Sequence, residues 1–308
     1  MLQKLNYHGS PRVKDESVEA LLGYMHGRAV EIGVSLNTVP PSICLINIEQ
    51  LAHPNHPVEV QGYVGLFTWL AVQLDDLIQR DDEMFKDASV FHQRLFNGER
   101  QPNNFLEGFA MILREAHDHF DTVIANMLQT SILNFLTSLL LERHDGFVHM
   151  KTSPAGVMFP YFYRDMSGLS VAYAVFCYPK QMYPDVGAFL EAIPDMAQFI
   201  NISNDVLSFY KEELSSDDRN YIRNRARCTG QPVLDVLADV QRETVECWQR
   251  ISAILKGRGK YEQSWNDSAA GYIAMHANNP RYRFNELGLG EEHPLDPFEH
   301  KITQFLDT

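Results

Sequence analysis

The sequence of 308 residues predicts an all-α fold. From residue 17 onward, long segments place apolar residues three and four positions apart, which is the period of an amphipathic helix. Alternating apolar and polar runs, which would indicate strands, are rare. Prolines then divide the helical pattern at starts or connections, because proline fits the first turn of a helix and breaks its interior. The prolines at these positions are Pro102, Pro154, Pro179, Pro184 and Pro232.

Each expected helix is an apolar-periodic stretch between such breaks. In chain order they cover residues 17–34, 58–78, 103–118, 120–143, 155–166, 170–176, 185–214, 231–255 and 262–277. No internal repeat, low-complexity tract or Gly/Ser-rich linker separates them. We therefore expect one domain over residues 1–308, with mobile ends at 1–14 and about 288–308.

The composition excludes several classes of function. Lys and Arg total 26 against 40 Asp and Glu, and the net charge of -14 would repel nucleic acid or an anionic membrane. An anionic substrate must therefore meet a local basic cluster or bound cations. The four cysteines show no metal-finger spacing and are too sparse for a disulfide framework. The N-terminus is polar, and we find no stretch approaching the ~20 apolar residues that span a bilayer. We expect a soluble, cytoplasmic protein without nucleic-acid or membrane partners.

Three oxygen-bearing side chains recur at steps of four in an otherwise apolar helix. Asn204, Ser208 and Glu212 therefore share one helix face, and Glu212 can reach back toward the other two. Such hard oxygen donors suit Mg²⁺. A polar, solvent-facing stripe is the alternative, but the intervening residues are mostly apolar: Val206, Leu207, Phe209 and Tyr210. The pattern favours a metal site.

Two adjacent carboxylates, Asp75 and Asp76, end a second helix that is apolar for most of its length. Burial of carboxylates is unfavourable unless a cation or hydrogen bonds compensate for it, and a metal would do so. Alternatively, both residues merely begin the charged loop at 79–83. Taken alone, this segment leaves the two interpretations open, and the metal interpretation gains from the first triad.

Arg164, Ser167 and Gly168 form an R-x-x-x-G pattern that lies 40 residues before Asn204. A small residue followed by glycine permits local unwinding of a helix, which exposes a carbonyl group toward a developing cation. A turn between two helices is the alternative, and both descriptions can hold together.

Near the C-terminus, Arg281 and Tyr282 could bind a phosphate group. A guanidinium bonds phosphate in a bidentate manner, and the tyrosine adds a hydroxyl donor. Lys211, beside Glu212, would supply a further cation. An isolated Arg-Tyr pair means little, so its weight comes from its position in the chain.

Together these motifs resemble the class I terpene cyclases, in particular the trichodiene synthase family. That family has an aspartate-rich helix end followed by N-D-x-x-S-x-x-x-E, which Asn204, Asp205, Ser208 and Glu212 match in full. The resemblance spans about residues 69–284. The departure is Gln79, which stands where the family usually carries a further acidic residue, while Asp81 and Asp82 come slightly later. Because the first aspartate makes the important metal contacts in the family, we interpret Gln79 as a tolerated variation.

The resemblance implies a helical barrel around a central cavity and three Mg²⁺ ions with bound diphosphate. It implies that Asp75 binds two ions, that Asp76 pairs with Arg281, and that the third ion is held by Asn204, Ser208 and Glu212. It also implies that Arg164 senses the diphosphate and that Ser167 and Gly168 link this sensor to the helix break. Diphosphate would be bound by Arg164, Lys211, Arg281 and Tyr282, the last two closing over it as a latch.

The implied function is that of a sesquiterpene cyclase. It would ionise farnesyl diphosphate with Mg²⁺, cyclise the carbocation, and release diphosphate with a hydrocarbon or alcohol; a C10 or C20 substrate stays open, as does a homodimer. Candidate aromatic lining residues, for each of which core packing is the stronger expectation, are Phe67, Trp69, Phe135, Phe159 and Phe162.

Two alternatives to a cyclase remain. A chain-elongating prenyl transferase shares the fold but uses two aspartate-rich motifs, so the asymmetric pair of motifs here argues against it. A non-catalytic helical prenyl-diphosphate-binding protein would not need the complete set of motifs. The product identity does not follow from the sequence.

Overall fold

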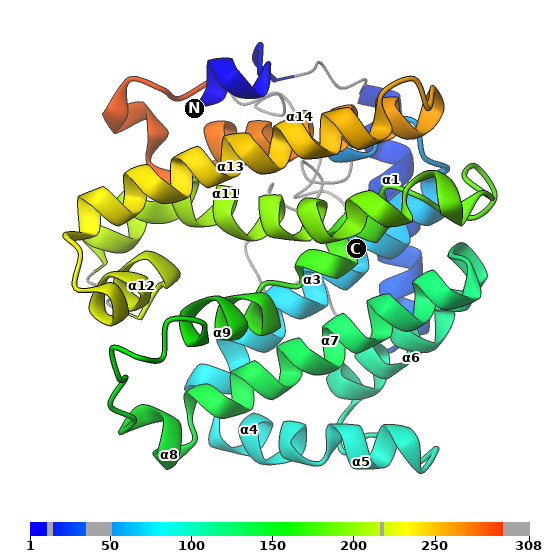
Figure 1. Ribbon diagram of the computed structural model, residues 1–308. Coiled ribbons are helices and arrows are strands. Elements are labelled where there is room, and N and C mark those ends of the chain that lie inside the picture. The colour runs from blue at the N-terminus through cyan, green and yellow to red at the C-terminus, as the bar shows by residue number, and fades with distance from the viewer. Residues whose placement is uncertain (11–14, 35–50, 216–218, 292–308) are drawn as a thin grey trace.

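The computed structural model describes residues 1–10, 15–34, 51–215 and 219–291 (Figure 1). Within these ranges all regular secondary structure is helical, which confirms the predicted fold class. The α-helices are α1 (Asp15–Glu31), α3 (Val58–Arg80), α4 (Asp82–Ser89), α5 (Phe91–Phe96), α6 (Asn104–His119), α7 (Thr122–Glu142), α8 (Asp145–Val148), α9 (Phe159–Ser167), α10 (Ser170–Phe176), α11 (Ile193–Leu214), α12 (Tyr221–Thr229), α13 (Val233–Leu255) and α14 (Lys260–Asn278). Short 3-10 turns η5 (Pro280–Tyr282) and η6 (Phe284–Leu287) follow α14.

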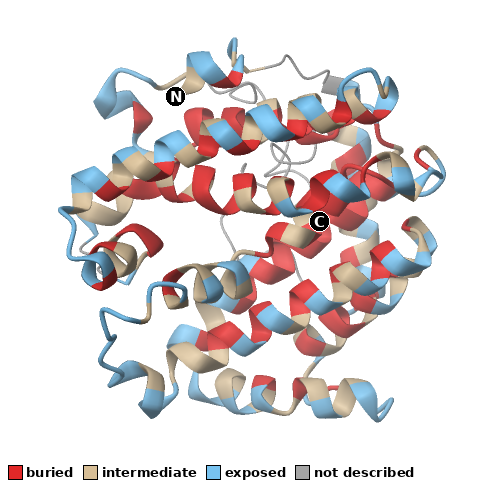
Figure 2. Ribbon diagram, in the orientation of Figure 1, coloured by how far each residue is buried: buried red, intermediate tan, exposed pale blue. Residues whose placement is uncertain are grey.

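The long helices pack side by side around a common interior. Helices α11, α13 and α14 lie together on one side, and α3, α6 and α7 lie on the other (Figure 1). Helix α11 packs against α10 and α13, while α7 packs against α9 and α10. Buried residues follow the inward faces of these helices and exposed residues the outward faces (Figure 2). This arrangement places the middle of α11 opposite the C-terminal end of α3.

Helix α3 is buried over most of its length and carries Asp75 and Asp76 near its C-terminal end. Nearly every residue from Val60 to Leu74 is buried, so its first four turns form part of the core. The helix ends at Arg80, and Asp81 then caps α4 by accepting hydrogen bonds from the backbone N–H groups of Glu83 and Met84. The predicted charged loop is therefore the junction between α3 and α4. Asp75 lies before it, on the last two turns of α3, where the helix leaves the core.

The expected helices are all present, with shifted boundaries. The stretch predicted at 155–166 begins only at Phe159, and the stretch predicted at 185–214 opens with two 3-10 turns before α11 starts. Four shorter helices, α4, α5, α8 and α12, were not predicted. They span four to nine residues, too few for an apolar period to stand out, and α4 and α12 are rich in charged side chains.

One sequence expectation is wrong as stated: α7 is long and apolar enough to cross a membrane by length and composition. Half of its most apolar stretch is buried inside the protein, however, and the helix packs against α3, α6, α9 and α10. A buried core helix passes the same test, so this feature is weak evidence for a membrane span.

The cysteines and the chain ends bear on two further expectations. Cys177, Cys228 and Cys247 are free and buried, and Cys44 lies outside the described residues. Of the ends expected to be mobile, residues 11–14 and 292–308 also lie outside the described ranges. The described part of the N-terminus is tied to the C-terminal segment, because Tyr7 and the backbone of Ser10 both donate hydrogen bonds to Glu291.

Candidate functional site

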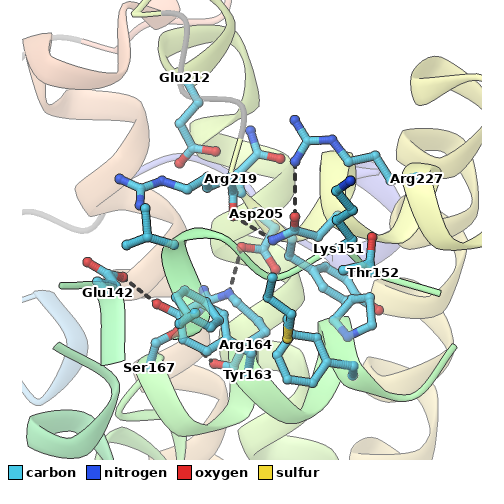
Figure 3. A pocket seen from close by; sticks show the side chains of 18 of the residues that line it. Glu142, Lys151, Thr152, Tyr163, Arg164, Ser167, Asp205, Glu212, Arg219 and Arg227 are labelled. Atoms are coloured by element: carbon cyan, nitrogen blue, oxygen red, sulfur yellow. Dashed lines mark hydrogen bonds and ion pairs between the residues drawn. The ribbon is translucent and has the colours of Figure 1, made fainter. Parts of the chain in front are cut away.

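A cavity of about 330 Å³ opens between α3, α11, α14 and the segment after α14. Its lining combines several of the predicted polar residues with apolar and aromatic side chains. The polar lining includes Asp75, Asp76, Arg164, Ser167, Asn204 and Arg281, and the remaining wall includes Ala71, Val72, Phe135, Leu169, Tyr173, Tyr272, Met275 and Tyr282. A polar pocket of about 710 Å³ shares Arg164, Ser167 and Asn204 with this cavity and reaches Glu212 (Figure 3).

The predicted triad lies on one face of α11. Ser208 is buried, and its hydroxyl donates to Glu212 Oε1 at 2.5 Å. Asn204 lies one turn earlier on the same face and lines both pockets. Glu212 lines the polar pocket, and Ser208 lines neither of these two pockets but contacts Glu212 through its hydroxyl. The spacing of four thus places the three oxygen-bearing side chains on one helix face, with one of them in the cavity.

The amide of Asn204 is held from both sides. Its Oδ1 accepts from Arg164 Nη2 at 3.2 Å, and its Nδ2 lies 3.0 Å from Nε2 of His276. His276 is fully buried on α14, and burial lowers its pKa to about 4, so the ring is neutral at neutral pH. None of the predicted motifs includes this histidine.

Arg164 joins α9 to α11 through several hydrogen bonds. Its Nε donates to Asp205 Oδ1 at 2.7 Å and its Nη2 to the Asn201 backbone carbonyl at 3.0 Å (Figure 3). The side chains of Arg164 and Asp205 are only 14% and 8% exposed, so this is a buried ion pair. Loss of one partner would leave the other charge uncompensated in the interior.

The helix break follows directly after Arg164, and glycine is required there by close approach. A Cβ atom on Gly168 would lie 1.9 Å from Asn201 Oδ1 and 2.4 Å from Arg164 Nη1. The backbone of Gly168 is ordinary, with φ -89°; the left-handed residue is Leu169, with φ +50°. Ser167 donates to the Arg164 carbonyl at 3.3 Å. The structure thus shows a break between α9 and α10, as expected, but the unusual conformation falls one residue later than the motif suggested.

Asp75 lies at the cavity mouth, where its side chain reaches solvent but is largely surrounded by protein. Burial and, to a smaller extent, the nearby carboxylates of Glu142 and Asp76 raise its pKa to about 6, against the opposing charges of Arg281 and Lys211. Excess negative charge at one point is what a bound cation would relieve.

Glu142, at the end of α7, lies beside Gln79, the residue that departs from the aspartate motif of the resembling family. It accepts a hydrogen bond from the Tyr163 hydroxyl (Figure 3) and another from the Gln79 side-chain amide. Gln79 therefore contributes no charge of its own but holds a carboxylate from another helix near Asp75. The sequence signal was available, because Glu142 ends an apolar helix as Asp75 does.

The other acidic residues of this segment have separate partners. Asp76 Oδ1 lies 3.7 Å from Arg80 Nη2, and among the described residues no ion pair joins it to Arg281. The expected pairing of Asp76 with Arg281 is therefore not made in this structure. Asp82 pairs with Arg143, which leaves it out of the cavity.

The predicted basic residues gather near the triad. Lys211 Nζ lies 3.7 Å from Glu212 Oε1 and 5.7 Å from the centre of the Tyr282 ring. The Tyr282 ring in turn lies 4.3 Å from the His276 ring, centre to centre. Arg281 is exposed beside the cavity mouth, on the 3-10 turn after α14.

Of the candidate aromatic residues, only Phe135 lines the cavity, and Phe159 lines the polar pocket. Phe67 and Trp69 are buried in the core, and Phe162 is 58% exposed. The cavity wall instead uses Tyr173, Tyr272 and Tyr282. Periodicity alone could not distinguish these faces, because both kinds of aromatic residue occur on apolar helices.

The donor chemistry fits a divalent metal. Within the described ranges no three His, Cys, Asp or Glu side chains cluster as a metal site. Asn204, Ser208 and Glu212 provide one amide, one hydroxyl and one carboxylate oxygen, all of them hard donors. Asp75, which lines the cavity, and Glu142, whose charge acts on Asp75, add carboxylates.

Comparison with known proteins identifies the family of this chain. Residues 43–308 match the family model described as trichodiene synthase (TRI5). The chain is 37% identical over 240 residues to longiborneol synthase CLM1 of Gibberella zeae, covering 77% of this chain and 70% of that protein. It is 35% identical over 235 residues to terpene synthase BipA of Cochliobolus sativus, covering 76% and 71% respectively.

The fold matches solved structures as well. One is a linalool/nerolidol synthase from Streptomyces clavuligerus, solved in complex with 2-fluorogeranyl diphosphate. The TM-score is 0.61 at 12% sequence identity, and the match covers 87% of this chain and 96% of that one. At that identity the likeness establishes the shared fold.

Proposed function

Because this chain belongs to the trichodiene synthase family, and is thus a class I terpene synthase, a sesquiterpene cyclase and a lyase acting on prenyl diphosphates, we propose that its cavity ionises farnesyl diphosphate. The observation that carries the proposal is the division of the cavity. Carboxylate and amide oxygen donors and cationic side chains line one part of its surface, and apolar and aromatic side chains line the rest. An amphipathic diphosphate ester fits both parts at once.

The metal ions are proposed to lie between α3 and α11. Asp75 would hold two Mg²⁺ ions, with Glu142 adding negative charge nearby, and a third ion would be held by Asn204, Ser208 and Glu212. Bound Mg²⁺ would neutralise the charge that builds on the departing diphosphate. Divalent metal use follows from the family. We propose that the metal is Mg²⁺ and that three ions bind with the diphosphate.

The diphosphate would be bound by Arg164, Lys211, Arg281 and Tyr282. Guanidinium and ammonium groups in a partly desolvated site stabilise developing negative charge without a general base. Ser167 and Gly168 would set the position of Arg164. The Ser167 hydroxyl donates a hydrogen bond to the Arg164 backbone carbonyl, and Gly168 leaves space for the Arg164 side chain. Asp76 lines the same mouth and would orient Arg281 once diphosphate is bound.

The hydrocarbon would occupy the inner wall. Aromatic faces attract a carbocation electrostatically without trapping it as a nucleophile would. Tyr173, Tyr272 and Phe135 are the aromatic residues placed to do this. A dry wall also keeps water from quenching the cation before cyclisation.

The cellular setting is part of the proposal. We propose one class I terpene synthase domain over residues 1–308, located in the cytoplasm, without nucleic-acid or membrane partners. The net charge of -14 and the buried free cysteines support this. A homodimer is left to sedimentation analysis.

The decisive test is product analysis. Purified protein with Mg²⁺ is incubated separately with the C10, C15 and C20 prenyl diphosphates, and volatile products are identified by gas chromatography. We expect a cyclic C15 hydrocarbon or alcohol from farnesyl diphosphate, and none in EDTA. A longer prenyl diphosphate formed when isopentenyl diphosphate is added would identify an elongating transferase, and no diphosphate release with any substrate would indicate a binding protein.

A further inference from the structure

His276 contacts one residue assigned to the metal and one assigned to the diphosphate. It is fully buried near the C-terminal end of α14. Its Nε2 lies 3.0 Å from the side-chain nitrogen of Asn204, and its ring lies 4.3 Å from the Tyr282 ring. No motif of the sequence analysis includes it.

The hydrogen bonds of His276 determine which ring nitrogen carries the proton. Nδ1 lies 2.8 Å from the backbone carbonyl oxygen of Tyr272, one turn earlier. A carbonyl oxygen only accepts, so Nδ1 is the donor there. In a neutral imidazole, Nε2 is then an acceptor. The donor to Nε2 must be the amide nitrogen of Asn204.

This fixes the orientation of the Asn204 amide. With Nδ2 facing His276, Oδ1 faces the opposite way and accepts from Arg164 at 3.2 Å. The reversed amide would place an NH₂ group against the Arg164 guanidinium, donor against donor. It would also exchange the oxygen, the atom proposed to bind the metal, for an NH₂ group on the side away from His276. An asparagine can bind a hard cation only through its oxygen.

The second contact concerns the Tyr282 ring. It packs against His276 with an angle of 43° between the ring planes, and Lys211 Nζ lies 5.7 Å from its centre. His276, Tyr282 and Lys211 therefore form a short column that begins at the metal-ligand asparagine and ends at a diphosphate-binding cation.

We propose that His276 is a positioning residue, which fixes the Asn204 amide with its oxygen toward the metal and supports the Tyr282 ring. The inference rests on the proposed function of Asn204 as a metal ligand. Partners that orient a first metal ligand typically change metal affinity by about 10–100-fold when removed. If the His276 ring only filled space, His276→Phe would leave the metal affinity unchanged, because phenylalanine fills the same space.

The test separates the hydrogen bond from the ring. His276→Phe keeps an aromatic ring beside Tyr282 but removes the acceptor for Asn204. His276→Gln restores a side-chain acceptor without a ring. The probe is Mn²⁺ with inorganic diphosphate, and its dissociation constant is measured by isothermal titration. We expect His276→Phe to bind Mn²⁺ at least about ten-fold more weakly, and His276→Gln to recover most of that loss.

A matched control lies on the same helix. Ser264 is also buried on α14 and donates to the Cys177 backbone carbonyl at 2.6 Å, roughly 18 Å along the helix from His276. Ser264→Ala removes a buried hydrogen bond far from the site, so it should lower stability and leave Mn²⁺ binding unchanged. Equal loss of Mn²⁺ affinity in Ser264→Ala and His276→Phe would overturn the proposal.

Asn204→Ala separates this inference from the proposed function. If Asn204→Ala weakens Mn²⁺ binding and His276→Phe does not, the metal site stands and the positioning role is wrong. If neither variant weakens binding, both the metal assignment of Asn204 and the role of His276 are overturned.

A measurement on the unaltered protein covers the case in which His276→Phe does not fold. Nitrogen NMR of histidine-labelled protein reports which ring nitrogen is protonated. We expect the Nδ1–H form for His276 and a change of its Nε2 resonance in Asn204→Ala. The Nε2–H form in the unaltered protein would overturn the proposal, because Nε2 could not then accept from Asn204.

Discussion

Gly168→Ala is the substitution that tests the helix break most directly. The added Cβ would lie 1.9 Å from Asn201 Oδ1 and 2.4 Å from Arg164 Nη1. The backbone of Gly168, at φ -89°, suits alanine, so the effect comes from crowding and not from conformation. The side chains of Asn201 and Arg164 must therefore shift, or α9 must move away from α11.

The magnitude follows from these contacts. Overpacking by one methyl group in a tight site destabilises by about 1–3 kcal/mol, which for a chain of this length lowers the melting temperature by roughly 2–6 °C. Displacement of a diphosphate-binding group by about 1 Å can lower turnover by about 100-fold. We expect kcat/KM for farnesyl diphosphate to fall by roughly 30–100-fold, measured by diphosphate release, beside a thermal melt.

Gly62→Ala provides the control. Its Cβ would lie 2.1 Å from the Tyr24 ring, where α3 meets α1, far from the cavity. This variant should lose stability by a similar amount and keep kcat/KM within about two-fold. Gly168→Ala with unchanged turnover, or Gly62→Ala with an equal loss of turnover, would refute the reasoning.

The remaining predictions concern the metal and diphosphate residues. Glu212→Gln should raise the Mg²⁺ concentration needed for half-maximal activity about ten-fold or more, because a charged ligand is lost; an unchanged metal titration would remove Glu212 from the site. Asp75→Asn should reduce turnover more than Asp76→Asn, and equal losses would contradict the division between ligand and orienting residue. For Asp75 the pKa of about 6 in the folded protein exceeds the ordinary 3.8, so the folded state binds the proton more tightly. In EDTA this group therefore adds stability as the pH falls from 7 through 6 toward 4, and the slope should be absent from thermal melts of Asp75→Asn. Addition of Mg²⁺ and diphosphate should slow hydrogen exchange in residues 279–284 around Arg281, and unchanged exchange under saturation would argue against a latch.

The helical fold was predictable because long amphipathic stretches carry a strong period. This period did not predict the short helices or the exact residues at which the long helices begin and end. Asp81 illustrates this: its side chain caps α4, yet in the sequence it is one of several acidic residues in a charged run. Capping depends on local backbone geometry, which a count of apolar positions does not contain.

Part of the site was predictable for a similar reason. Asn204, Ser208 and Glu212 share a face through helix geometry alone, so their spacing predicts their proximity. Glu142 and His276 come near them only through the packing of α7 and α14 against the cavity, which no local pattern specifies. Gln79 shows the limit most clearly, because its role depends on a carboxylate that is 63 residues away in sequence.

The same packing supplies a reason for the aspartate within the metal motif. The Oδ1 atom of Asn204, which is the atom proposed to bind the metal, already accepts from Arg164 at 3.2 Å. A carbonyl oxygen has two lone pairs, so it can serve a guanidinium and a cation together, but the two positive charges would then lie close to one another and repel. Asp205 lies 2.7 Å from the same guanidinium and is itself buried, so it offsets that charge locally. Asp205 would therefore act on the proposed metal site through Arg164, which gives a reason for an acidic residue beside Asn204 whose side chain pairs with α9.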